Sequence, residues 1–132
     1  LQAALHQLVT WVTNGVAPTT APRIEVTEDD DLEIVRDEMG IAVGGIRTPP
    51  VIAPLRILFG DPAVSDGFCF LFGQTLDIDQ VTLLSMYQSL DGYVTDLEAA
   101  AIRSVENGWL LQVDADIMIE EETRRALALG LE

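Results

Sequence analysis

Residues 36–54 read RDEMGIAVGGIRTPPVIAP and residues 68–79 read FCFLFGQTLDID, and these two stretches decide the fold. Both combine glycine and proline with apolar residues in a way that neither a helical nor a strand period explains. Three glycines and three prolines interrupt regular structure from residue 40 to about residue 54. The pattern therefore predicts turns and short strands here, including one short strand over Leu55–Phe59.

A helix precedes this region and begins without a capping residue. Apolar residues at Leu1, Ala4, Leu5, Leu8 and Val12 are in helical phase from the first position, and Asn14-Gly15 supplies a left-handed stop. No initiator Met and no Ser, Thr, Asp or Asn stands before the helix. We therefore expect this chain to be cut from a longer protein, although trimming of a disordered terminus is the simpler alternative.

Two short strands are predicted between the first helix and the glycine-rich stretch. After the proline-punctuated segment 16–23, alternating residues in Arg23–Val26 and Leu32–Val35 indicate a hairpin around the acidic turn Thr27–Asp31.

The last third of the chain is predicted to be helical. Asp79 is a good N-cap, Ser89 or Asp91 caps the next helix, and Asn107-Gly108 ends it. A final helix is expected to start at Asp114 and to end at Gly130. On it, Glu120–Arg124 and Glu121–Arg125 should form ion pairs on a solvated face, each contributing about 0.2–0.5 kcal/mol.

The two stretches resemble the C-terminal region of a bacterial family of α/β-hydrolase-domain proteins. In that family a GGIRTP-type segment precedes an F-C-x-L-F-G segment and two alanine-rich helices, and the resemblance runs over nearly the whole chain. It implies a mainly helical α+β fold, the C-terminal portion of an α/β-hydrolase, with short strands and three to four helices. It also implies a last core helix at 1–15, an irregular short-strand segment at 16–78 and a helical segment at 79–132.

The composition of the chain limits the kinds of partner that it can bind. The net charge is −15 and all seven basic residues are arginine, which argues against nucleic-acid binding. No apolar run is long enough to span a membrane. The single cysteine, Cys69, rules out an internal disulfide and is predicted to be buried between phenylalanines. The sequence does not indicate the cellular compartment of the protein.

The chain does not carry a hydrolase's catalytic residues. An α/β-hydrolase needs a serine in a G-x-S-x-G turn, followed by an acid and a histidine, and no such pentapeptide occurs here. The single histidine, His6, lies inside the first helix, where a surface or packing role is favoured over catalysis. We expect no catalytic residue among these 132.

Metal sites are not predicted either, and no cofactor is expected. A calcium loop starting at Asp29 would need glycine and glutamate where the chain has Ile34 and Gly40. One histidine and one cysteine cannot supply a closed zinc site.

The segment 44–49, GGIRTP, is the one stretch expected to touch a substrate, through Arg47 and Thr48. Arg47 could hold a carboxylate or carbonyl in a forked hydrogen bond. The alternative, which we favour, is that the glycines make a turn and Arg47 pairs with an acid such as Asp37 or Glu38.

Two functions follow as hypotheses. The first is the C-terminal part of an ester or acyl hydrolase, inactive alone, whose partners are the remainder of its own domain and a small ester-like substrate. The reaction is implied by the resemblance only. The second is a non-catalytic helical interaction module.

Overall fold

The computed structural model describes residues 1–28, 32–60, 68 and 72–132. Within these residues the chain forms five helices and one two-stranded sheet. In chain order they are α1 (Gln2–Asn14), α2 (Pro49–Ile52), β1 (Arg56–Phe59), β2 (Gln74–Asp77), α3 (Gln80–Tyr87), α4 (Leu90–Glu106) and α5 (Gln112–Ala128). The predicted mainly helical α+β class is confirmed, with one helix more than the three to four expected, because Pro49–Ile52 forms a single turn. Cys69 and the acidic residues 29–31 lie outside the described residues.

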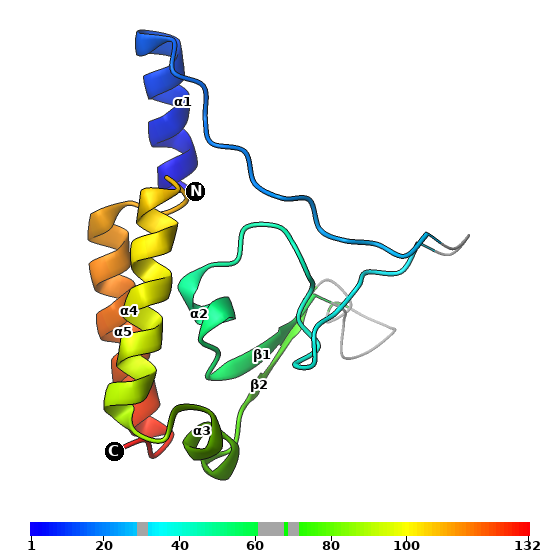
Figure 1. The fold of residues 1–132 in the computed structure, drawn as a ribbon, viewed down its shortest axis with the longest axis vertical. Helices are drawn as coiled ribbons and strands as arrows, with labels where there is room; N and C mark the ends of the chain where they lie inside the picture. Colours follow the sequence, from blue (N-terminus) through cyan, green and yellow to red (C-terminus); the bar gives the residue numbers. More distant parts are fainter. Residues whose placement is uncertain (29–31, 61–67, 69–71) are drawn as a thin grey trace.

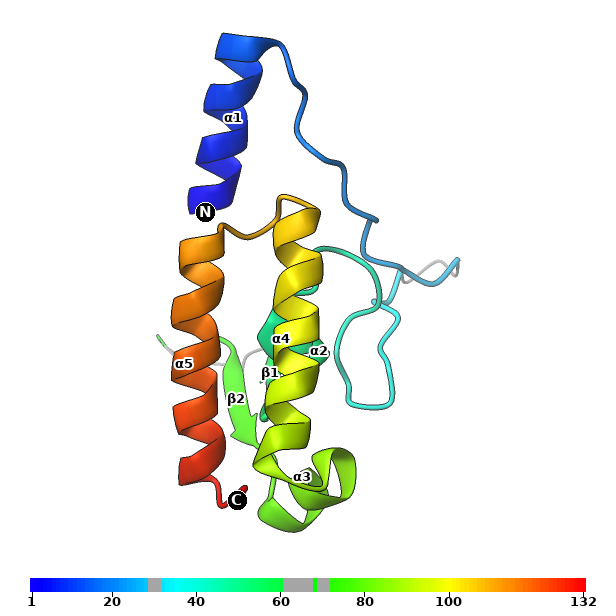
Figure 2. The same cartoon turned by 60° about the vertical axis from the view of Figure 1, so that its left-hand side comes forward.

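The antiparallel pair of α4 and α5 forms the long axis of the molecule (Figures 1 and 2). Both helices bury alanines: Ala100 and Ala101 on α4 and Ala115 and Ala126 on α5 are all at most 2 % exposed. Small side chains allow two helices to approach closely. No helix in the described part of the chain combines the length and apolar character needed to cross a membrane.

Local capping residues set the ends of the C-terminal helices. Asp79 accepts a hydrogen bond from the Thr82 backbone N–H at 3.1 Å, and Ser89 Oγ accepts from Gly92 N–H at 3.1 Å. Both predicted caps are therefore confirmed, with Ser89 rather than Asp91 as the cap of α4. Bonds to Thr82 lower the pKa of the Asp79 carboxyl.

Only one of the two ends of α5 lies where the sequence predicts it. The helix begins at Gln112, so the expected start at Asp114 is wrong by two residues. Asp114 lies in its first turn, where a negative charge favours the helix dipole. The predicted end is confirmed, since the helix ends at Ala128 with Leu129 as its C-cap, and Gly130 follows with a left-handed φ of +89°.

The short sheet is an antiparallel hairpin packed beside the helices. β1 confirms the predicted strand at Leu55–Phe59, whereas β2, which pairs Arg56 with Asp77 and Phe59 with Gln74, was not predicted. Leu55 and Ile78 close one end of the hairpin through a 3.0 Å backbone bond. Both are buried and join the core, whose other members are Ala53, Leu83, Tyr87, Tyr93, Leu97, Ala126 and Leu131.

The predicted hairpin over 23–35 forms as isolated pairing rather than as two regular strands. Val26 bridges Ile34, with backbone bonds from Thr27 N–H to Glu33 O (2.8 Å) and from Val35 N–H to Glu25 O (3.0 Å). Leu32, at the turn end of this pairing, has a positive φ of +40°. The turn itself falls at residues 29–31, outside the described part.

Helix α1 stands at the α4–α5 turn, away from the main core (Figures 1 and 2). It starts without a side-chain cap and ends at Gly15, which has a φ of +71°, as predicted. Residues 16–24, here called the arm, carry no regular structure and return the chain to the body of the molecule. Ala3 is the one buried residue of α1, so few apolar contacts fix this helix.

Candidate functional site

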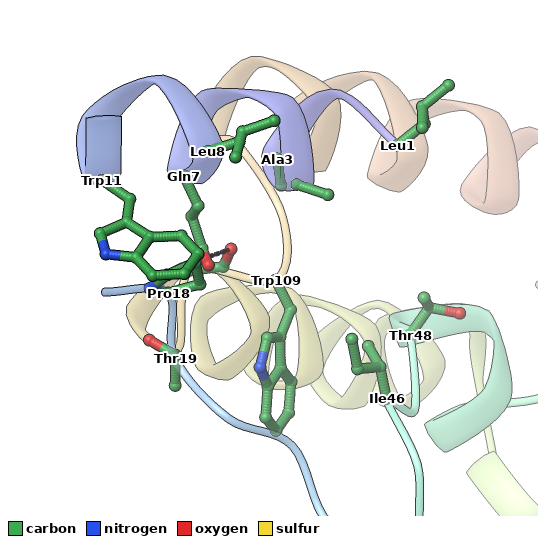
Figure 3. Close-up of a pocket in the computed structure, with 12 residues that line it drawn as sticks. Leu1, Ala3, Gln7, Leu8, Trp11, Pro18, Thr19, Ile46, Thr48 and Trp109 are labelled. Atoms are coloured by element: carbon green, nitrogen blue, oxygen red, sulfur yellow. Dashed lines mark hydrogen bonds between the residues drawn. The ribbon is translucent and has the colours of Figure 1, made fainter. Parts of the chain in front are cut away.

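A cavity of 510 Å³, here called the α1 pocket, opens between α1, the arm, the GGIRTP segment and the α4–α5 turn (Figure 3). Most of its lining is apolar, and no charged side chain contributes to it: the lining residues are Leu1, Ala3, Ala4, Gln7, Leu8, Trp11, Pro18, Thr19, Ile46, Thr48, Gly108 and Trp109. Concave, mainly apolar cavities of 300–1,000 Å³ with a few polar groups are typical of small-molecule sites. The α1 pocket is therefore the candidate site.

Helical spacing places the lining residues of α1 on one side. Leu1, Ala4, Leu8 and Trp11 recur at intervals of three and four residues, so their side chains share a face. On the opposite wall, Ile46 and Thr48 come from the GGIRTP segment, and Trp109 comes from the turn after α4 (Figure 3). Residues more than 100 positions apart thus meet at one cavity.

The polar groups of the pocket differ in what they bond. Gln7 donates its side-chain amide to Gly108 O, which ties α1 to the α4–α5 turn. The hydroxyls of Thr19 and Thr48 make no hydrogen bond within the described residues. The Trp109 indole N–H is buried and has no acceptor in the same part of the chain. Orientation in the pocket would therefore come from the two threonine hydroxyls.

Arg47, the first of the two predicted substrate-binding residues, is engaged within its own loop. Its guanidinium contacts Asp37 Oδ2 at 2.8 Å and approaches the carbonyl oxygens of Ala42 (3.4 Å) and Val51 (3.5 Å). The favoured alternative, pairing with Asp37, is therefore what the structure shows. Burial raises the pKa of the Asp37 carboxyl, but hydrogen bonds from Arg47 and from the amides of Ile41 and Met39 more than offset this and leave that pKa lowered.

The glycines of the same segment make the turn that the sequence predicts. Gly44 and Gly45 have φ values of +82° and +70°. A Cβ on Gly44 would overlap the Arg23 carbonyl oxygen, so this position requires close backbone approach as well as a positive φ. Together the Arg47–Asp37 pair and these glycines present Ile46 and Thr48 to the α1 pocket.

The remaining sequence candidates do not assemble into a catalytic group. His6 is exposed on α1, and its ring has no hydrogen-bond partner among the described residues. Ser85 and Ser104 donate their hydroxyls to helix carbonyls, and Ser89 is a cap. Ser65 lies outside the described residues. No group of three potential metal ligands occurs in the described ranges.

One buried ion pair was not predicted. Glu122 is 6 % exposed, and its carboxylate contacts Arg56 at 2.6 Å and Arg125 at 3.5 Å. The four residues of the expected solvated face, Glu120, Glu121, Arg124 and Arg125, are exposed, whereas Glu122 beside them is buried. The predicted Glu120–Arg124 pair is confirmed at 2.8 Å, whereas Arg125 contacts Glu122 instead of Glu121.

Two tyrosines lie beside this ion pair in the core. Tyr87 and Tyr93 pack edge to face with ring centroids 5.1 Å apart. Burial raises the pKa of both phenols. Tyr87 donates to Pro54 O at 3.0 Å, whereas the Tyr93 hydroxyl has no partner among the described residues. This cluster is structural: the ion pair joins β1 to α5, and Tyr87 joins α3 to α4 and to the segment that precedes β1.

A family model described as alpha/beta hydrolase domain matches residues 1–120. The chain belongs to this family. The match extends from α1 into α5 and includes every residue that lines the α1 pocket. No curated protein and no solved structure matches the chain.

Proposed function

We propose that this chain is the C-terminal part of an alpha/beta hydrolase that cleaves ester or related acyl bonds, with the catalytic residues supplied by another part of a longer protein. The observation that carries the proposal is the family match over residues 1–120. The 132 residues lack the G-x-S-x-G turn that an α/β-hydrolase uses to present its nucleophile. The chain by itself is therefore inactive, and its role is to complete the domain and to wall the substrate site.

An uncovered strip on α1 supports a second part of the same domain as partner. Leu5, Val9 and Val12 follow the spacing i, i+4 and i+7 and are 54 %, 60 % and 79 % exposed. They lie beside the face that lines the pocket, so α1 is apolar over more of its surface than the described residues cover. A core helix of a larger domain has this character.

The experiment compares ester hydrolysis by two proteins. The 132-residue chain and the protein encoded by the whole reading frame are each assayed with p-nitrophenyl butyrate, a neutral short-chain ester. We expect turnover from the longer protein only, abolished when the serine of its G-x-S-x-G turn is replaced by alanine. Hydrolysis by the 132-residue chain at the same rate would refute the proposal.

The uncovered strip also fits the second candidate, a non-catalytic interaction module. In that case another protein would cover α1. The two candidates differ in the upstream sequence. A G-x-S-x-G turn and a later loop histidine in the same reading frame favour the hydrolase, and their absence favours the module.

A further inference from the structure

We propose that the α1 pocket binds the uncharged, apolar acyl or aryl part of an ester and that the Thr48 hydroxyl donates a hydrogen bond to its carbonyl oxygen. The assignment to a substrate rests on the proposed function, whereas binding of this chemical class rests on the pocket alone. Thr48 acts here as a residue that positions the ligand.

Charge determines the class of ligand. No charged side chain lines the pocket, and Arg47, the nearest arginine in sequence, is held by Asp37. A carboxylate or phosphate entering the cavity would lose its hydration without gaining a cation. The net charge of −15 further opposes anions. The pocket therefore selects neutral ligands.

Shape and surface determine the apolar part of the ligand. Trp11 on α1 and Trp109 on the α4–α5 turn supply two large aromatic walls, and Leu8 on α1 and Ile46 on the GGIRTP segment add aliphatic surface to the lining (Figure 3). Such walls favour flat rings and short alkyl chains through burial and ring contacts. The volume of 510 Å³ accommodates a phenyl ring with a short acyl chain.

The polar end of the ligand is fixed by Thr48. Its hydroxyl makes no hydrogen bond within the described residues, and the segment that carries it is anchored by the Arg47–Asp37 pair and by the close approach of Gly44 to the Arg23 carbonyl. Thr19 presents a second hydroxyl from the arm, which carries no regular structure. The carbonyl should therefore pair with the better-held donor, Thr48.

Tryptophan fluorescence tests this directly, because the chain has two tryptophans and both line the pocket. The protein is titrated with N-phenylbutyramide, an uncharged amide in place of the ester, with butylbenzene, which lacks the carbonyl, and with butyrate, which is anionic. We expect saturable emission changes with the first two probes, tighter for the amide, and none with butyrate.

Substitution of the threonines separates the hydrogen bond from general packing. Thr48→Val should weaken binding of N-phenylbutyramide by about two- to tenfold, the usual range for one neutral hydrogen bond, and should leave butylbenzene binding unchanged. Thr13→Val, on the exposed side of α1 and outside the pocket, is the matched control and should change neither. Equal binding of butyrate, or a Thr48→Val protein that binds both neutral probes like the wild type, would overturn the proposal.

Other occupants give different results. If a second copy of the chain fills the pocket, tryptophan emission will vary with protein concentration and the neutral probes will not displace that copy. This outcome would overturn the proposal. Failure of the proposed function appears separately, as absent ester turnover in the longer protein while the probes still bind.

Discussion

Removal of the Glu122 carboxylate should destabilise the protein far more than removal of any exposed acid on the same helix. Glu122 is 8 % exposed in its side chain and contacts Arg56, which is 21 % exposed, at 2.6 Å. In Glu122→Ala the Arg56 guanidinium remains largely buried without its partner, and its Nε already lacks one among the described residues. The cost is that of an unpaired buried cation.

The magnitude follows from the exposures. Breaking a fully buried ion pair costs about 3–5 kcal/mol, and Arg56 keeps a fifth of its surface in water, so we expect a loss of about 2–3 kcal/mol in the free energy of unfolding. Glu120→Ala is the matched control on the same helix. Its pair with Arg124 is 75 % and 67 % exposed, and its loss should cost at most about 0.5 kcal/mol.

Urea unfolding followed by circular dichroism measures both changes, since urea does not screen charge. High salt should remove the small effect of Glu120→Ala and leave that of Glu122→Ala. Adding Arg56→Met to Glu122→Ala should recover part of the stability. A Glu122→Ala protein within about 0.5 kcal/mol of Glu120→Ala would refute the reasoning.

Three further predictions concern the loop and the core. The pKa of the Asp37 carboxyl is lower in the folded protein than the unfolded value of 3.8, so its carboxylate stabilises the fold above that pH, and this stabilisation is lost as the pH falls through the folded pKa. The difference in unfolding free energy between the wild type and Asp37→Asn should therefore be constant near neutral pH and shrink in acid; a difference that grows in acid would contradict the Arg47 contact. Tyr87→Phe should cost about 1–2 kcal/mol in urea unfolding by leaving a buried carbonyl unbonded, whereas Tyr93→Phe should be near neutral, and equal losses would show that both hydroxyls are bonded. Gly44→Ala should lower the free energy of unfolding, measured in urea, by more than the roughly 1 kcal/mol cost of a positive φ alone, because the new Cβ meets a carbonyl oxygen of the arm; a variant as stable as the wild type would show that this approach is not close.

Features governed by neighbouring residues could be predicted from the sequence. Caps at Asp79 and Ser89 and the glycine ends at Gly15 and Gly130 depend on side chains and φ values within one helical turn, and all four are present in the structure. The short turn α2 was missed because its prolines suggest a break. Proline at the first helical positions also begins helices, as Pro49 does here.

Features governed by distant residues could not be predicted in this way. Strand β2 exists because β1 pairs with it, and Glu122 is buried because Arg56 reaches it across 66 positions. The candidate site shows the same limit. Thr48 was expected to touch a substrate, yet the wall that faces it consists of α1 and Trp109, and no local pattern brings those segments together.

The arm that joins α1 to the rest of the molecule gives the chain two levels of cooperativity. Because α1 buries a single residue and is tethered by residues 16–24, it can detach while the pair α4–α5 stays folded. Its amides should exchange with deuterium through this partial opening, whereas those around Leu97 should exchange through global unfolding alone. Whatever occupies the cavity beneath α1 will slow the first process and leave the second almost unaltered.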